Sequence, residues 1–253
     1  FSVWPGLDGS VMQAMEAQQV PRVDRIVAVS DTLVERLSAL SLGKPVELLT
    51  HGIDLEHWAA KSAAPSHIEA PAREKSSAGV GDFWPADAGP IKLFWGLIDQ
   101  RLDMRMIEAL AATPGTLVLV GPTQSPDPRL GRLANVRLPG PAAYDVLPVL
   151  AAGADVLVMP YADLPVTRAM QPLKLKEYLA TGRPVVVSDL PATRPWADCC
   201  DVIGDPAEMA QRVEQRMAEG MPASQAAARQ RLGTETWKAK AEQLERIMFA
   251  GLS

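Results

Sequence analysis

Residues 91–120 read IKLFWGLIDQRLDMRMIEALAATPGTLVLV, and this stretch decides the expected fold. The apolar runs at residues 91–95 and 116–120 are typical of buried strands, and the apolar spacing after Asp103 predicts a helix between them. Short turns with Gly or Pro separate the three elements. A strand, a helix and a second strand in this order form the repeating unit of a parallel α/β sheet.

The same alternation continues toward the C-terminus. Further strands are predicted at residues 136–138, 155–159, 184–187 and 201–203, with a helix at residues 172–181. We therefore expect an α/β fold, a Rossmann-like doubly wound parallel sheet, over residues 91–232. Beyond Pro206 the pattern becomes helical, and residues 233–253 are expected to form a final helix that crosses back to the first domain.

The N-terminal part of the chain shows a second, smaller α/β pattern. Residues 25–29 and 46–49 predict strands, and Ser30 and Asp31 are suited to begin a helix between them. Residues 1–51 are therefore predicted to be the C-terminal part of another Rossmann-like domain. Residues 52–90, rich in Ala, Ser, Pro and Gly, are predicted to be a linker or surface loop. Because Phe1 begins without a methionine or a signal-peptide pattern, we expect an upstream part to be missing.

Composition excludes several classes of protein. Hydrophobic residues make up 47% of the 253 residues and charged residues 22%, as in globular proteins with a core. A net charge of -5 argues against nucleic acid as the main partner. The longest apolar runs, such as residues 116–120, are far shorter than the about 18 residues of a membrane span. The adjacent Cys199 and Cys200 are unsuited to pair with each other, which fits a reducing, cytoplasmic location.

One candidate site follows the first strand of the large sheet. Gly96 comes directly after that strand, where a residue without a side chain lets a ligand approach the backbone. Arg101 follows in the same loop and has the length and charge to reach a phosphate. The structural alternative is that Gly96 serves the turn and Arg101 is a solvated charge. Alone, this motif is weak evidence for a binding site.

A second candidate site begins the predicted helix at residues 172–181. Pro172 suits the first helical position, so unpaired N–H groups and the positive end of the helix dipole are expected beside Lys174. Glu177 follows three residues later on nearly the same helical face, where it can accept protons from hydroxyl groups. The alternative is an ordinary surface ion pair between Lys174 and Glu177. The residues alone leave both interpretations open.

Several segments resemble one enzyme family. The segment PLKLKEYLATGRPVV is similar to the donor-site helix and following strand of GT-B glycosyltransferases of the retaining, group 1 type. The pieces AVSDTLVERL, THGID, WGLIDQRLD, LVLVGP and ADVLVMPY, and the region of Trp237, recur in that family in the same order. The resemblance covers most of the chain, and it is the combination of these pieces that is specific.

This resemblance implies a two-domain enzyme whose second domain binds a nucleoside-diphosphate sugar. It implies that Gly96 lies beside the donor diphosphate, that Lys174 neutralises the charge of that diphosphate, and that Glu177 binds the ribose or the donor sugar. Arg101 is a further phosphate partner, and these three charged residues, Lys174, Glu177 and Arg101, are the predicted catalytic residues. Other residues that the resemblance places around the nucleotide are Leu97, Gly121, Pro122, Thr123, Gln171, Pro172 and Leu173, with residues 138–142 near the base and His51 on the hinge side or cleft wall.

One departure from the family pattern concerns the donor sugar. Many retaining members carry two glutamates separated by seven residues, and Ala169 stands here at the position of the first. The resemblance is closer to subfamilies in which Gln171 or backbone groups replace that carboxylate. Contacts to the donor sugar are therefore the least defined part of the predicted site.

The predicted function is transfer of a sugar from a nucleoside-diphosphate donor, UDP- or GDP-linked, in polysaccharide or glycoconjugate synthesis. The acceptor is a saccharide, a lipid-linked or a small molecule, with no cofactor, no metal ion and no nucleic acid. Retention of configuration is implied by the resemblance alone. The expected location is cytoplasmic, and Arg22, Arg25 and Lys44 are weak evidence for peripheral association with the inner face of the membrane.

Two other functions remain open at this stage. A nucleotide-sugar epimerase of the same fold would bind the same donor but need an acid and a base across the cleft. A non-catalytic GT-B-like binding module is favoured by Ala169 and opposed by the pair Lys174 and Glu177. Acceptor-dependent transfer would separate a transferase from both.

Overall fold

The computed structural model describes residues 7–62, 83–84 and 89–250. Its main body is one parallel sheet of six strands in the order β5-β4-β3-β6-β7-β8. From β3 the chain winds outward to β5, and from β6 it winds outward in the opposite direction to β8. The predicted doubly wound sheet is confirmed, and the order reverses between β3 and β6, where such sheets bind ligands. The strands are β3 (Ile91–Trp95), β4 (Thr116–Val120), β5 (Val136–Gly140), β6 (Val156–Met159), β7 (Val185–Ser188) and β8 (Asp201–Ile203).

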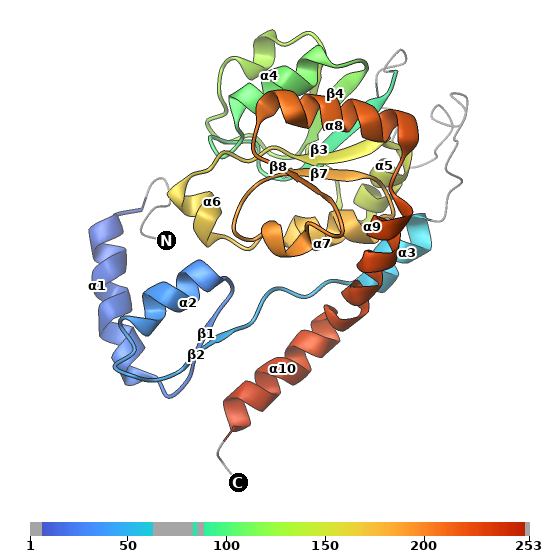
Figure 1. The fold of residues 1–253 in the computed structure, drawn as a ribbon. Helices are drawn as coiled ribbons and strands as arrows, with labels where there is room; N and C mark the ends of the chain where they lie inside the picture. The colour runs from blue at the N-terminus through green and yellow to red at the C-terminus, as the bar shows by residue number, and fades with distance from the viewer. Residues whose placement is uncertain (1–6, 63–82, 85–88, 251–253) are drawn as a thin grey trace.

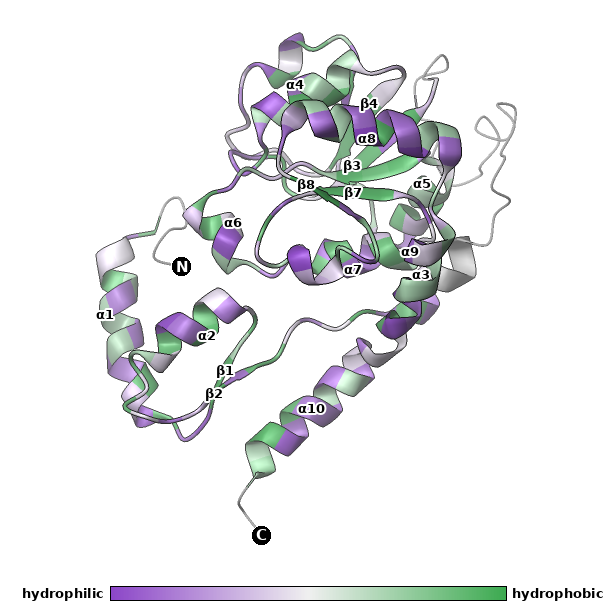
Figure 2. Ribbon diagram, viewed as in Figure 1, coloured by the Kyte–Doolittle hydropathy of each residue, from purple (hydrophilic) through white to green (hydrophobic). Residues whose placement is uncertain are grey.

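Helices cover both faces of this sheet. On one face α4 (Met104–Ala112) packs against α8 (Pro206–Glu219), and on the other lie α5 (Leu147–Gly153) and α7 (Leu173–Ala180), as Figure 1 shows. The short α6 (Pro165–Ala169) precedes α7, and α9 (Ala223–Ala228) follows α8. This layering explains why β3, β4, β6 and β7 are buried along their whole length and strongly apolar (Figure 2).

Lys92 is a charged residue inside this apolar core. Its side chain is fully buried, and its Nζ donates hydrogen bonds to the carbonyl of Leu110 (2.9 Å), Thr113 Oγ1 (2.7 Å) and the carbonyl of Pro114 (2.9 Å). Burial lowers the pKa of Lys92 to about 8. The lysine thus satisfies carbonyl groups at the end of α4 that the core would otherwise leave without partners.

The N-terminal part forms a separate two-stranded parallel sheet of β1 (Ile26–Ala28) and β2 (Val46–Leu48). Helix α1 (Gly9–Gln19) precedes it, and α2 (Asp31–Ser38) connects the strands. The Ser30 side chain caps α2 by accepting a hydrogen bond from the backbone N–H of Leu33, as the sequence predicts. Both strands are shorter than predicted, because only three residues of each pair in register.

The predicted linker at residues 52–90 contains a packed helix. Helix α3 (Leu55–Ser62) lies against α5 and α7, and its Trp58 is fully buried. Further along, Phe83 and Trp84 also pack on the core, Trp84 beside Gly153. Prediction of a structureless linker was therefore wrong for these residues. The eight-residue helix is too short to show a clear period, and its burial depends on helices distant in sequence.

The chain passes between the two parts a second time at the C-terminus. Helix α10 (Trp237–Phe249) leaves the large sheet and reaches the N-terminal part, where Gln243 Nε2 donates to the carbonyl of Leu48 (3.3 Å). At its start, Ile53 and Thr236 form a parallel bridge. We call the two segments that connect the parts of the chain, around Gly52 and around Thr236, the first and second crossing. A Cβ on Gly52 would lie 2.6 Å from Trp237 Cα, so only glycine fits between the two crossings. No described helix has the length and hydropathy needed to cross a bilayer.

Lys176 of α7 holds both crossings. The lysine is 1% exposed, and its Nζ donates to Thr50 Oγ1 (3.1 Å) and to the carbonyl of His51 on the first crossing. It also forms an ion pair with Glu235 (2.5 Å), which lies on the second crossing. Helix α7 is thereby tied to both segments that join the two parts of the chain.

Candidate donor-binding site

The loops that follow β3 and β4 touch each other at two glycines. A Cβ on Gly121 would lie 1.9 Å from the carbonyl oxygen of Gly96, and both residues have positive φ angles, +149° and +140°. Gly96 N donates to the Val120 carbonyl and Ile98 N to the Pro122 carbonyl, both at 2.9 Å. The predicted residues Gly96, Gly121 and Pro122 thus form one backbone surface at the carboxyl end of the sheet.

Lys174 reaches this surface from α7. Its Nζ lies 2.5 Å from Tyr161 Oη and 4.7 Å from the centroid of the Phe94 ring. A Cβ on Gly96 would lie 2.0 Å from Lys174 Nζ, so the lysine occupies the space that the glycine leaves. Burial, and secondly the charge of Arg101, lower the pKa of Lys174 to about 7. The structure therefore brings Lys174 and Gly96 together, 78 residues apart in the sequence.

Helix α7 begins one residue later than predicted. Pro172 is the N-cap residue, with an extended backbone (ψ 106°), and Leu173 is the first helical residue. The Pro172 ring carries no polar group, so no side chain caps the helix. Among the described residues, no hydrogen bond to the backbone N–H of Leu173 or Lys174 is present. The helix therefore starts one residue later, and its unpaired N–H groups still lie beside the Lys174 ammonium, as an anion site requires.

Glu177 lies on the same face of α7 as Lys174. Its side chain is 7% exposed, and Oε2 accepts a hydrogen bond from Trp95 Nε1 (3.1 Å). Burial raises the pKa of Glu177, whereas the Trp95 hydrogen bond and the positive charge of Lys174 act in the opposite direction. The predicted pair therefore faces β3, with Glu177 buried and Lys174 half-buried, and the surface ion pair of the alternative interpretation is excluded.

Arg101 lies at the rim of the same site. Its guanidinium forms an ion pair with Asp99 (2.9 Å) and lies 5.8 Å from the centroid of the Tyr161 ring. Its positive charge acts on Lys174. The structure brings Arg101 near Lys174 and pairs it with Asp99, two residues earlier in the same loop, which was not among the predicted site residues.

An aromatic cluster under the site was also missed. The ring of Trp95, at the end of β3, stacks on the ring of Trp58 from α3, with centroids 5.4 Å apart and planes 8° apart. Beside them, His57 stacks on Tyr144 at 4.2 Å. The two pairs come from three separate segments of the chain, and nothing in the spacing of these residues indicates that they meet.

The region predicted near the base lies next to the glycine loops. Gly121 N donates to the carbonyl of Gly140 (2.9 Å) at the end of β5, and Leu138 is 40% exposed there. Residues 138–142 therefore continue the surface of Gly96 and Gly121 outward along the edge of the sheet. Leu97 and Leu173 are partly exposed, on the β3 loop and at the start of α7, and Thr123 bridges to Ile98.

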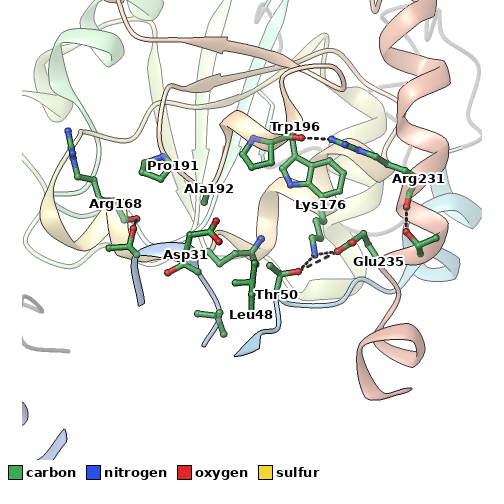
Figure 3. Close-up of a pocket in the computed structure, with 16 residues that line it drawn as sticks. Asp31, Leu48, Thr50, Arg168, Lys176, Pro191, Ala192, Trp196, Arg231 and Glu235 are labelled. Carbon is green, nitrogen blue, oxygen red and sulfur yellow. Dashed lines mark hydrogen bonds and ion pairs between the residues drawn. The ribbon is translucent and has the colours of Figure 1, made fainter. Parts of the chain in front are cut away.

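Gln171, just before α7, lies in a different pocket from Lys174. Its Oε1 accepts a hydrogen bond from the backbone N–H of His51 (3.3 Å), and it lines a pocket of about 280 Å³ between the N-terminal part and the large sheet (Figure 3). Nearby, Ser30 Oγ donates to the carbonyl of Ala169 (2.7 Å), at the position of the missing glutamate. Other residues that line this pocket are Asp31, Thr50, Arg168, Lys176, Trp196 and Arg231.

Comparison with known proteins places the site in a family. The family described as Glycosyl transferases group 1 matches residues 99–219. This chain carries a group 1 glycosyltransferase domain. The matched region includes Arg101, Gly121, Lys174 and Glu177, and it contains α7 and the strands on both sides of it. Among the described residues, no group of three or more His, Cys, Asp or Glu is arranged to hold a metal ion.

A curated relative is similar to more than half of this chain. The protein of Bacillus subtilis (strain 168) named teichuronic acid biosynthesis glycosyltransferase TuaH is 32% identical over 191 residues, or 72% of this chain and 45% of TuaH. The chain therefore spans less than half the length of this relative.

Several solved structures share the GT-B fold of this chain. Alr3699/HepE of Anabaena, in complex with UDP, has a TM-score of 0.72 at 14% identity. The match covers 97% of this chain and 69% of the HepE chain. Sucrose-phosphate synthase of Thermosynechococcus elongatus has a TM-score of 0.68 at 22% identity. The match covers 95% of this chain and 62% of the synthase chain. At these identities the likeness shows the fold alone.

Proposed function

We propose that this chain is the donor-binding half of a glycosyltransferase that transfers a sugar from a nucleoside-diphosphate sugar. The observation that carries the proposal is the meeting of Lys174 Nζ, the Gly96 backbone and the start of α7. A flat backbone surface, an ammonium group and unpaired helix N–H groups together suit a diphosphate. Because the HepE structures contain UDP and UDP-glucose, we favour a UDP-linked donor over a GDP-linked one.

In the proposed mechanism, the leaving diphosphate is stabilised by fixed positive groups of the protein. Cleavage of the bond between the sugar and the diphosphate places negative charge on the departing phosphate oxygen. Lys174 and the N-terminus of α7 would face that charge, with Arg101 at the rim, and no metal ion or cofactor is required. Glu177 would accept hydrogen bonds from hydroxyl groups of the donor. Retention of configuration is part of this proposal by family analogy.

We propose that the acceptor approaches from the side of the N-terminal part. The pocket between the N-terminal part and the large sheet has a carboxylate, Asp31, hydroxyl groups of Thr50 and other residues, and the ring of Trp196 (Figure 3). Carboxylates, hydroxyl groups and an aromatic ring suit a hydroxylated molecule such as a saccharide, free or lipid-linked. The name of TuaH, which refers to teichuronic acid biosynthesis, supports a bacterial polysaccharide as the product.

Calorimetric titration of this chain with UDP, GDP, ADP and TDP, in the presence of a chelator, tests the donor site. Selective binding of UDP, weakened in Glu177→Ala, is the expected result. A folded sample that binds none of the four would contradict the proposal and favour a non-catalytic module. Release of UDP from UDP-glucose that depends on an acceptor, measured on the full-length protein, distinguishes a transferase from an epimerase.

Binding of UDP is expected to take up a proton through Lys174. The pKa of Lys174 in the free protein is about 7, and a bound anion would raise it, since the anion favours the ammonium form. Affinity should therefore fall as the pH rises from 7 to 9. Calorimetry in two buffers with different ionisation enthalpies would measure the proton taken up.

The matched control for this measurement is Lys174→Arg. A guanidinium stays protonated throughout this pH range, so the variant should show a flatter pH profile and no linked proton at this position. Equal proton uptake by the wild-type protein and the arginine variant would contradict the assignment to Lys174.

A further inference from the structure

Trp95 is held rigidly at the end of β3. The residue is 4% exposed, and its ring lies between those of Trp58 (5.4 Å between centroids) and Tyr178 (4.1 Å). Its backbone N–H donates to Tyr178 Oη (3.0 Å). Ring contacts on two sides and a fixed backbone leave the indole a single orientation, and the direction of its N–H is fixed with it.

That N–H points at one oxygen of Glu177. The bond from Trp95 Nε1 to Glu177 Oε2 is 3.1 Å long, and within the described residues it is the one hydrogen bond that the carboxylate makes. A carboxylate has two oxygens, each able to accept about two hydrogen bonds. With Oε2 held by the indole, Oε1 is left to accept hydrogen bonds from a ligand.

We propose that Trp95 is a positioning residue of the donor site, whose indole N–H orients Glu177 so that Oε1 receives the ribose hydroxyl groups of the bound nucleotide. This inference rests on the proposed function, because it assumes that the nucleotide lies over Gly96 and Lys174. Trp95 itself does not touch the nucleotide in this arrangement. Its effect passes entirely through the carboxylate.

The same hydrogen bond opposes the effect of burial on the pKa of Glu177. Burial raises the pKa of Glu177, and a protonated acid would lose acceptor strength toward hydroxyl groups. Trp95, then Lys174 and His57, act against burial. Tyr144 and Tyr178 also face the carboxylate, and each has its pKa raised, mainly by burial. Trp95 is neutral, so it can be altered without changing any charge at the site.

The substitution Trp95→Phe separates positioning from packing. Phenylalanine keeps an aromatic ring between Trp58 and Tyr178 but removes the N–H donor. Trp84→Phe is the matched control, because Trp84 is also buried at the edge of the same core and lies away from Glu177, beside Gly153. Thermal unfolding of both variants checks that each remains folded.

The first readout is the affinity for UDP and for 2′-deoxy-UDP between pH 5.5 and 8. We expect Trp95→Phe to bind UDP about tenfold more weakly, with the larger loss toward low pH, and to discriminate less against 2′-deoxy-UDP. Trp84→Phe should match the wild type. Unchanged discrimination against 2′-deoxy-UDP, or a loss equal in both variants, would overturn the inference and leave the proposed donor site standing.

The second readout needs no ligand. Glutamate labelled with ¹³C at the carboxyl carbon, assigned by its loss in Glu177→Gln, reports the pKa of Glu177 by NMR titration. The pKa should rise in Trp95→Phe, and an unchanged pKa would overturn the role of the indole. If the wild-type chain bound no nucleotide at all, the proposed function would fail, and this titration would still decide whether Trp95 controls the carboxylate.

Discussion

Replacing Lys174 with alanine is expected to weaken UDP binding about a hundredfold, the largest effect on binding that we predict. The substitution removes the ammonium that lies beside the Gly96 backbone, in a site where burial strengthens its attraction for a diphosphate. Loss of one partner from a buried charged contact weakens binding by about 2–5 kcal/mol. Isothermal titration calorimetry at pH 6.5, where most of the lysine is protonated, would measure the change.

Lys238→Ala is the control for Lys174→Ala. Lys238 is an exposed lysine on α10, and it has the same charge without any contact with the site. Its removal should leave the affinity within about twofold of the wild-type value. If both variants lost affinity to the same extent, general charge attraction would explain the binding of UDP, and the predicted site would be wrong.

Replacing Lys176 with methionine is expected to lower the free energy of unfolding by about 3 kcal/mol. The substitution leaves the His51 carbonyl and Thr50 without their donor and removes the buried partner of Glu235. Glu235 keeps Lys240 at 2.8 Å, so the expected loss is at the lower end for a buried ion pair. The midpoint of thermal unfolding should fall by about 5–10 °C.

The two lysines should therefore give opposite results although they are two residues apart. Lys174→Ala should change binding strongly, and Lys176→Met should change stability strongly while affecting UDP only indirectly. Lys240→Met provides the second control, because it removes the other partner of Glu235 without touching either crossing carbonyl. A midpoint in Lys176→Met equal to that of Lys240→Met would show that the bonds to Thr50 and His51 contribute little.

The large sheet could be predicted closely because its strands are buried on both faces. Residues 91–95 and 116–120 form β3 and β4 with the predicted bounds, since continuous apolar runs between Gly and Pro turns leave little choice. Helix α3 could not be predicted in this way. Trp58 is buried by α5 and α7, which lie far along the sequence, and the local composition of its segment is that of a loop.

The site shows the same division between local and distant contacts. Lys174 and Glu177 share a face because helical spacing requires it, and this was visible in the sequence. The bond from Trp95 to Glu177 joins residues 82 positions apart, and Tyr161 reaches Lys174 from the end of β6. The sequence therefore predicted which side chains carry charge but not which neighbours fix their pKa values and directions.

The side-by-side crossings have a consequence for motion. Gly52 lies against Trp237, and Ile53 bridges to Thr236, so the two connections between the parts of the chain meet at one place. Two adjacent connections resist sliding and separation of the two parts but permit one part to rotate against the other about the point where the connections meet. Relative movement of the two parts should then be a swing about this point, small at Lys176 and growing toward the Ser30 contact with Ala169.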